Sequence, residues 1–174
     1  MAKEDAAKEY ARTLREGLDR IRENKAAAVG EQLLKKDYTR VAREQGPEEL
    51  QSLGACLQSG AEAANSVPAL PRHTYFPGSH RVNAGIFAIV PSPFSGLDIY
   101  RLDVAVGLQP NADQFMDLNH APPVKSIVWH LRAAADDSGF FWLNVESGER
   151  ITSQELASVA LKCLSKFLMQ QAAQ

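Results

Sequence analysis

The sequence has no long hydrophobic run, and this absence limits where the protein can work. No stretch approaches the roughly 18 apolar residues that a membrane-spanning helix requires. The opening residues, MAKEDAAKEYARTLREG, are charged throughout and lack the apolar region of a secretory signal peptide. We therefore expect a cytoplasmic protein with no membrane partner.

An excess of basic residues is also missing. The chain holds 19 Lys and Arg against 21 Asp and Glu, for a formal net charge of -2, and residues 1–50 hold eleven of each sign. Nucleic-acid-binding proteins usually present a clustered basic excess that displaces counterions from phosphates. This balance argues against a nucleic-acid partner.

Motifs of the common catalytic and cofactor sites are missing as well. The two cysteines, Cys56 and Cys163, form no CxxC pair, and we expect both to be reduced thiols. The chain contains no GxSxG, no GxxxxGK[ST] and no GxGxxG after a strand, and its four histidines show neither HxH nor HExxH spacing. These absences favour a non-enzymatic protein without a cofactor.

Good helix formers dominate residues 3–45, which we predict to be helical. Charged residues surround a narrow stripe, so this helix should lie on the surface of its own domain or pair with another helix. Heptad spacing is not sustained, which argues against a long coiled coil. The stripe consists of apolar residues three or four positions apart: Ala7, Tyr10, Leu14, Leu18 and Ile21.

Breaks in this pattern suggest the domain organisation. Helical structure should end before Gly46-Pro47 and resume in a further helix within residues 47–65. We therefore predict an N-terminal helical segment over residues 1–65 and a Pro-rich linker over residues 66–80. An antiparallel sheet with a C-terminal helix should then occupy residues 81–174, and a single compact domain over the whole chain stays open as an alternative.

After residue 81 the apolar pattern changes to the two-residue period of strands. We predict strands at 82–90, 97–108, 125–135 and 140–145, with residues 91–96 (PSPFSG) as a turn and 125–145 as a hairpin. Thr152 and Glu155 form a capping box that begins a helix with a broad apolar face, which should pack on the sheet. The fold class expected is α+β, with about four to six antiparallel strands.

Two polar groups are candidate ligand sites. Asp113, Asp117 and His120 could bind a metal ion, but they match no compact ligand motif and a solvated connection is the favoured interpretation, so we expect no metal site. The second group is expected on one face of neighbouring strands, as a solvated cross-strand network or as contacts in a polar pocket. Its members are Asp103, His130 and Arg132.

Aromatic residues mark a candidate interaction surface. Phe140 and Trp142 share one face of a predicted strand, and the N-terminal helices of the same chain or of a partner could cover them. Together with Tyr10 and Leu14 they support a non-enzymatic interaction or adaptor module that self-associates as a homodimer. The alternative is a small-ligand-binding domain or enzyme with a polar pocket between sheet and helix.

Overall fold

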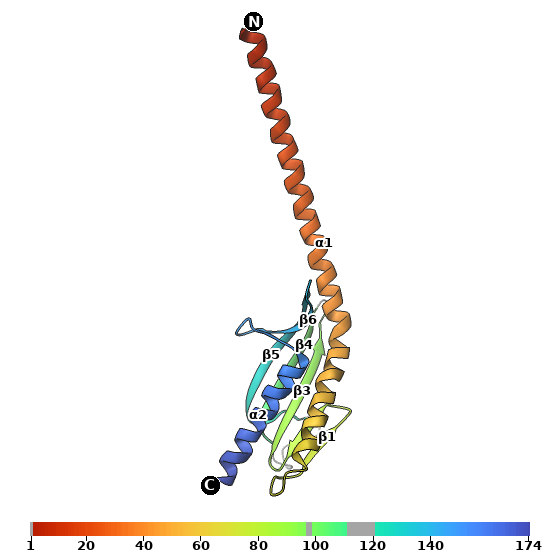
Figure 1. Ribbon diagram of the computed structural model, residues 1–174, viewed down its shortest axis with the longest axis vertical. Coiled ribbons are helices and arrows are strands. Elements are labelled where there is room, and N and C mark those ends of the chain that lie inside the picture. The colour runs from red at the N-terminus through yellow and green to blue at the C-terminus, as the bar shows by residue number, and fades with distance from the viewer. Residues whose placement is uncertain (1, 97–98, 111–120) are drawn as a thin grey trace. The chain divides into compact units, whose positions relative to one another are not determined.

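The computed structural model has the predicted α+β architecture, with seven strands where about four to six were expected (Figure 1). It describes residues 2–96, 99–110 and 121–174, without the side chains of residues 2–8 and 11. The elements in chain order are α1 (Ala2–Ala64), β1 (His73–Phe76), β2 (Arg81–Ala84), β3 (Phe87–Ser95), β4 (Tyr100–Leu108), β5 (Val124–Asp136), β6 (Gly139–Asn144), β7 (Arg150–Ile151) and α2 (Ser153–Ala172).

The chain divides into two units, Met1–Tyr38 and Thr39–Gln174. Helix α1 contributes to both, since it continues without interruption from Ala2 to Ala64. The helix end predicted before Gly46-Pro47 is therefore wrong, and the expected further helix within residues 47–65 is the last part of α1.

Tertiary packing explains why α1 continues through Pro47. Proline inside a helix costs about 3 kcal/mol, and each fully buried leucine returns roughly 1.5–3 kcal/mol. A Cβ at Gly46 would lie 2.5 Å from Tyr100 Cδ1, so the glycine lets the helix approach this ring. Several leucines outweigh one proline. The buried positions lie on one stripe that runs past the proline: Ala42, Gly46, Leu50, Leu53, Leu57 and Ala61.

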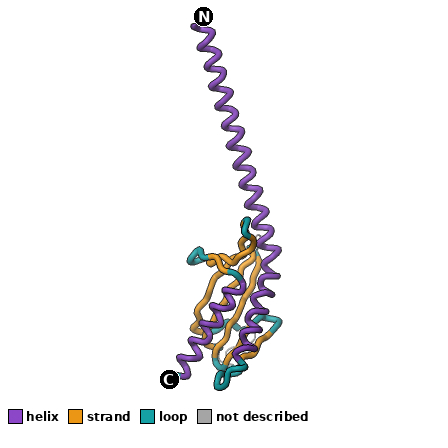
Figure 2. The backbone as a smooth tube through the Cα atoms, viewed as in Figure 1, coloured by secondary structure: helices purple, strands orange, loops and turns teal. Residues whose placement is uncertain are grey.

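The seven strands form one antiparallel sheet in which chain order and spatial order are the same (Figure 2). Strand β1 lies within residues 66–80, which the sequence had suggested as a linker. Asn65 fixes this segment, because its side-chain amide donates to the His73 carbonyl (2.9 Å) and its carbonyl accepts from the His73 N–H (2.7 Å). Residues 73–76 therefore belong to the sheet.

A tight turn divides the strand predicted at 82–90. Gly85 has a φ of 58°, and Ala84 pairs with Phe87 across the two residues between them. Glycine at the first central position with positive φ is typical of a type II′ hairpin turn. Residues 82–90 thus belong to two strands, and the segment expected as a turn at 91–96 extends β3 to Ser95.

Prolines occupy one hydrogen-bonding side of β3. The Gly96 N–H bonds to the Ile99 carbonyl across the turn to β4 (2.8 Å). Hydrogen-bonding directions alternate along a strand, so the backbone nitrogens of Pro91 and Pro93 point away from β4, toward the side of β3 that β2 occupies. The pairing with β2 does not extend as far as these two prolines. Proline has no N–H, which makes it suited to an unpaired side of a strand.

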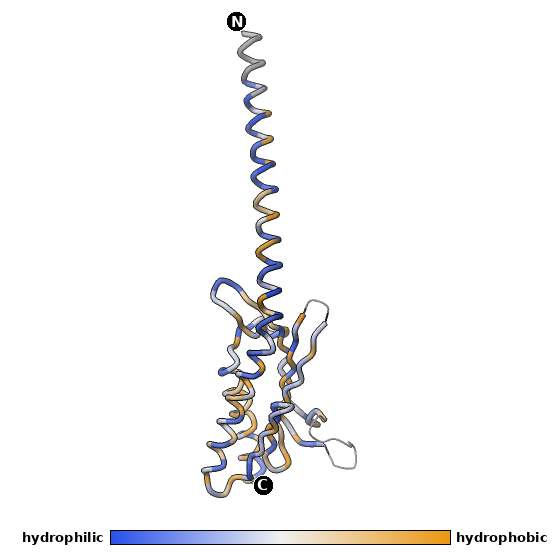
Figure 3. The backbone as a smooth tube through the Cα atoms, turned by 90° about the vertical axis from the view of Figure 1, so that its right-hand side faces the viewer, coloured by the Kyte–Doolittle hydropathy of each residue, from blue (hydrophilic) through white to orange (hydrophobic). Residues whose placement is uncertain are grey.

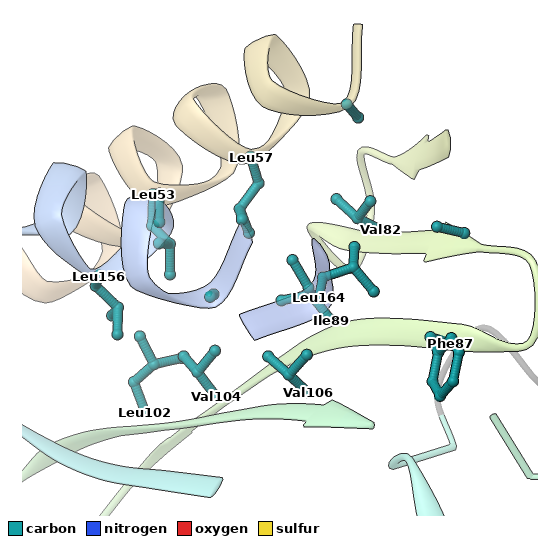
Figure 4. Close-up of a cluster of buried hydrophobic side chains, with 14 of the residues drawn as sticks. Leu53, Leu57, Val82, Phe87, Ile89, Leu102, Val104, Val106, Leu156 and Leu164 are labelled. Atoms are coloured by element: carbon teal, nitrogen blue, oxygen red, sulfur yellow. The ribbon is translucent and has the colours of Figure 1, made fainter. Parts of the chain in front are cut away.

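Both helices of the Thr39–Gln174 unit pack on one face of the sheet (Figure 4). Leu53 and Leu57 of α1 and Leu156 of α2 contribute to this core, together with strand residues such as Val104 and Ile89. The capping box of Thr152 and Glu155 is present at the start of α2, as predicted. The predicted alternation in β4 and β5 is confirmed, and its core side includes Leu102, Val104, Val106 and Leu131.

The opposite face, here called the outer face, is only partly covered. Arg81 on this side is fully buried, and its Nη1 donates to the Ala121 carbonyl (2.9 Å). Ala88, Val90 and Ala105 are buried near it. Farther along β4 and β5 the outer side chains are exposed, and this exposed end holds the predicted polar group.

Candidate interaction surfaces

The N-terminal part of α1 carries large apolar side chains in contact with solvent. Tyr10 is 67% exposed and Leu14 is 51% exposed. In Figure 3 hydrophobic positions recur among hydrophilic ones along this helix. The set, here called the α1 stripe, consists of Tyr10, Leu14, Leu18, Ile21, Val29, Leu33 and Leu34.

Charged pairs along the helix surround the α1 stripe. Lys35 Nζ lies 2.8 Å from Glu31 Oε1, and Arg12 Nε lies 3.8 Å from Glu16 Oε1. The hydrogen bond from Lys35 lowers the pKa of the Glu31 carboxyl. Exposed pairs of this kind contribute little to stability, because solvent screens the two charges. They support the helix but do not replace the packing that most helices require.

Trp142, proposed as part of an interaction surface, lies fully buried in the core. Its Nε1 donates to Ser153 Oγ at the start of α2 (3.0 Å), and Phe140 packs edge-on against it with ring centroids 5.1 Å apart. The face that bears both aromatics is thus covered by helices of the same chain. Of the four candidate residues, Tyr10 and Leu14 are the exposed ones.

The structure brings together two of the three predicted ligand contacts. Asp103 and His130 are cross-strand partners on the outer face, and Asp103 Oδ1 lies 2.9 Å from His130 Nδ1. Both side chains are at least one-third exposed. Arg132, two residues along β5, is also exposed. The group forms an open surface rather than a pocket between sheet and helix.

Sequence reasoning missed a partly buried pair, Tyr75 and His80, at the turn between β1 and β2. His80 is 8% exposed, has a φ of 54°, and shares a hydrogen bond of 2.7 Å with the Tyr75 hydroxyl. Burial lowers the pKa of His80 and raises that of Tyr75. A Cβ at Gly54 would lie 2.1 Å from His80 Nδ1, so glycine in the middle of a helix was the available signal.

A pocket of about 380 Å³ lies beside this pair. It is formed by α1, the turn before β2 and the side of β3 that holds the prolines. No charged side chain lines it, and buried His80 contributes a ring that titrates below its ordinary range. Its lining residues are Leu50, Gln51, Gly78, Ser79, His80, Val90, Pro91, Ser92 and Pro93.

Asp113, Asp117 and His120 lie outside the described residues. Among the residues that are described, no group of three or more His, Cys, Asp or Glu side chains is arranged to hold a metal ion. Within the same part of the chain, no helix is both long enough and apolar enough to cross a bilayer. Both cysteines are free, and burial raises the pKa of Cys163.

Comparison with known proteins gives no relative for this architecture. No protein-family model, no curated protein and no solved structure matches the chain.

Proposed function

We propose that this protein is a non-enzymatic interaction module that self-associates through the α1 stripe. The observation that carries the proposal is the exposure of seven large apolar side chains within residues 10–34. Single exposed hydrophobic residues are common on protein surfaces, but several of them at helical spacing on one helix are typical of an interaction site. A second copy of the same helix offers a complementary apolar surface.

The spacing within the α1 stripe is suited to helix pairing. Tyr10 and Ile21 are eleven residues apart, as are Leu18 and Val29. Eleven residues complete three turns at about 3.67 residues per turn, so these side chains return to nearly the same face. This spacing differs from a heptad, and where it holds it favours nearly straight or slightly right-handed packing.

The expected contact is long but narrow. About 30 residues of helix extend over roughly 45 Å, and a strip about 10 Å wide on each of two helices buries on the order of 1,000 Å² in total. This area is near the lower limit of roughly 1,000–1,200 Å² for specific interfaces. We therefore expect association that depends on protein concentration.

Sedimentation velocity of the full chain over a range of concentrations tests this proposal. The wild-type protein should shift from monomer to dimer with increasing concentration, and Leu14→Glu should shift the equilibrium toward monomer by about tenfold or more, because a charge would be buried in the contact. Ala27→Glu is the matched control, since it adds the same charge at an exposed position on the helix face opposite Leu18 and Val29. A wild-type chain that stays monomeric at all concentrations contradicts the proposal.

A small-ligand-binding function is the second candidate, and the pocket beside His80 favours it. Its volume of about 380 Å³ falls within the range of roughly 300–1,000 Å³ that is usual for ligand sites. Its uncharged lining suits a neutral molecule with an apolar body. A thermal-shift screen of neutral fragments, repeated on Ser92→Trp to fill the pocket, tests this candidate. Stabilisation that persists in Ser92→Trp would exclude the pocket.

A further inference from the structure

Two arginines lie directly opposite each other on the outer face of the sheet. Arg101 in β4 pairs in register with Arg132 in β5, and both side chains are exposed. Directly opposed residues on antiparallel strands have Cβ atoms about 4.5–5.5 Å apart, and like-charged side chains at such paired positions are destabilising. The arrangement therefore carries a cost in the isolated chain.

The acidic residues near this pair are already engaged. Asp103 binds His130, and Asp136 binds Ser138 and Arg150. Within residues 2–96, 99–110 and 121–174, no carboxylate forms an ion pair with Arg101 or Arg132. The repulsion between the two guanidinium groups is thus not relieved by the described part of the chain.

One neighbouring ring fixes where the Arg101 charge lies. The Arg101 guanidinium lies over the Phe94 ring, 5.7 Å from its centroid. Leu143 of β6 lies opposite Arg132 on its other side. The paired strands β4 and β5 support both arginines rigidly. A guanidinium that is already held in place loses less side-chain entropy when it binds a ligand.

We propose that Arg101 and Arg132 together bind a phosphate group, either inorganic phosphate or a phosphomonoester. Guanidinium groups donate bidentate hydrogen bonds to phosphate oxygens, and two arginines at directly opposed strand positions match the charge of a dianion. His130 lies two residues from Arg132 on the same face and adds a further polar contact. Binding would convert a costly pair of like charges into a favourable cluster.

The surroundings favour an isolated phosphate group over a nucleic-acid strand. Asp103 and Asp136 lie on the same face, and the chain has a net charge of -2. Arg101 already occupies one side of the Phe94 ring, which reduces the surface on which a base could stack. The site therefore suits one phosphate and not a polyanion.

Isothermal titration calorimetry of the full chain at constant ionic strength tests the proposal, with inorganic phosphate, phosphoserine and acetate as probes. We expect saturable binding of at least one phosphate probe that is tighter than that of acetate. Arg132→Gln and Arg101→Gln should each weaken it by about tenfold or more, because a charged hydrogen-bond partner is lost. Tighter binding of phosphoserine than of phosphate identifies a phosphomonoester, and equal or weaker binding identifies the free anion.

Arg15→Gln is the matched control, because it removes the same charge from an exposed position of α1. It should leave phosphate binding unchanged. Thermal unfolding without phosphate provides a second measurement, in which Arg132→Gln should raise the midpoint by relieving repulsion. No saturable binding of either phosphate probe at millimolar concentration, equal losses in Arg15→Gln and Arg132→Gln, or a lowered midpoint in Arg132→Gln would overturn the proposal.

Discussion

Single residues determine how the stability of this protein depends on pH, and His80 is the clearest case. Burial lowers the pKa of His80 in the folded protein. The unfolded chain takes up this proton near pH 6.5, so the unfolded state binds more protons below that pH. The free energy of unfolding should therefore fall as the pH falls below about 6.5.

Chemical denaturation between pH 5 and pH 7 measures this dependence, because histidine titrates in about this range. His80→Asn should flatten the curve, because asparagine does not titrate and tolerates the positive φ of this position. A wild-type slope that survives in His80→Asn would assign the dependence to another group.

Trp142 should be the residue whose indole nitrogen matters most to stability. Trp142→Phe removes the donor to Ser153 Oγ and leaves unfilled volume in the core, so we expect a loss of about 2 kcal/mol in the free energy of unfolding. The same substitution at Trp129, which is only partly buried, should cost clearly less. Urea denaturation of both variants makes the comparison, and equal losses would contradict it.

At the scale of elements, α1 shows where local sequence signals give way to packing. Gly46 and Pro47 predict a helix end, and both lie within a continuous helix because the buried leucine stripe holds the segment against the sheet. The prediction of a turn over residues 91–96 was wrong for a related reason. Its prolines lie on an unpaired side of a strand, where proline is tolerated. The capping box of α2 and the alternation of β4 needed no tertiary context, and both predictions are confirmed.

Two glycines of α1 should respond in opposite ways to the same substitution. Gly30→Ala should stabilise the helix by up to about 1 kcal/mol and raise its thermal midpoint. Nothing lies within 4 Å of the position that the added Cβ would take, and alanine favours helix over glycine. Gly46→Ala should instead lower stability, since the new methyl group would clash with the Tyr100 ring. Circular dichroism melts record both. Stabilisation by Gly46→Ala would show that the contact with Tyr100 does not restrict this position.

At the scale of the whole molecule, we expect residues 1–38 to be needed for self-association and residues 39–174 to be sufficient for folding. A chain of residues 39–174 keeps the entire core cluster, while it lacks every residue of the α1 stripe. We expect it to unfold cooperatively with a midpoint close to that of the full chain and to remain monomeric. Calorimetry and sedimentation measure the two properties. Loss of the cooperative transition would show that residues 1–38 contribute to the fold.

The candidate surfaces could be predicted only in part, and the reason is geometric. Spacing alone identified Tyr10 and Leu14, because one helix face is a local property. Whether Trp142 is exposed depends on where α1 and α2 pack, which the strand pattern does not contain. The opposition of Arg101 and Arg132 depends on strand register, and the His80 site depends on a distant glycine in α1.

The two prolines of β3 have a consequence for the proposed self-association through α1. Association raises the local concentration of the attached sheets, to millimolar levels for short connections. An open strand with free N–H donors would then invite edge-to-edge growth toward aggregates. Because Pro91 and Pro93 withhold those donors, the part of β3 that extends beyond β2 lacks the N–H groups needed to pair with a strand of another copy.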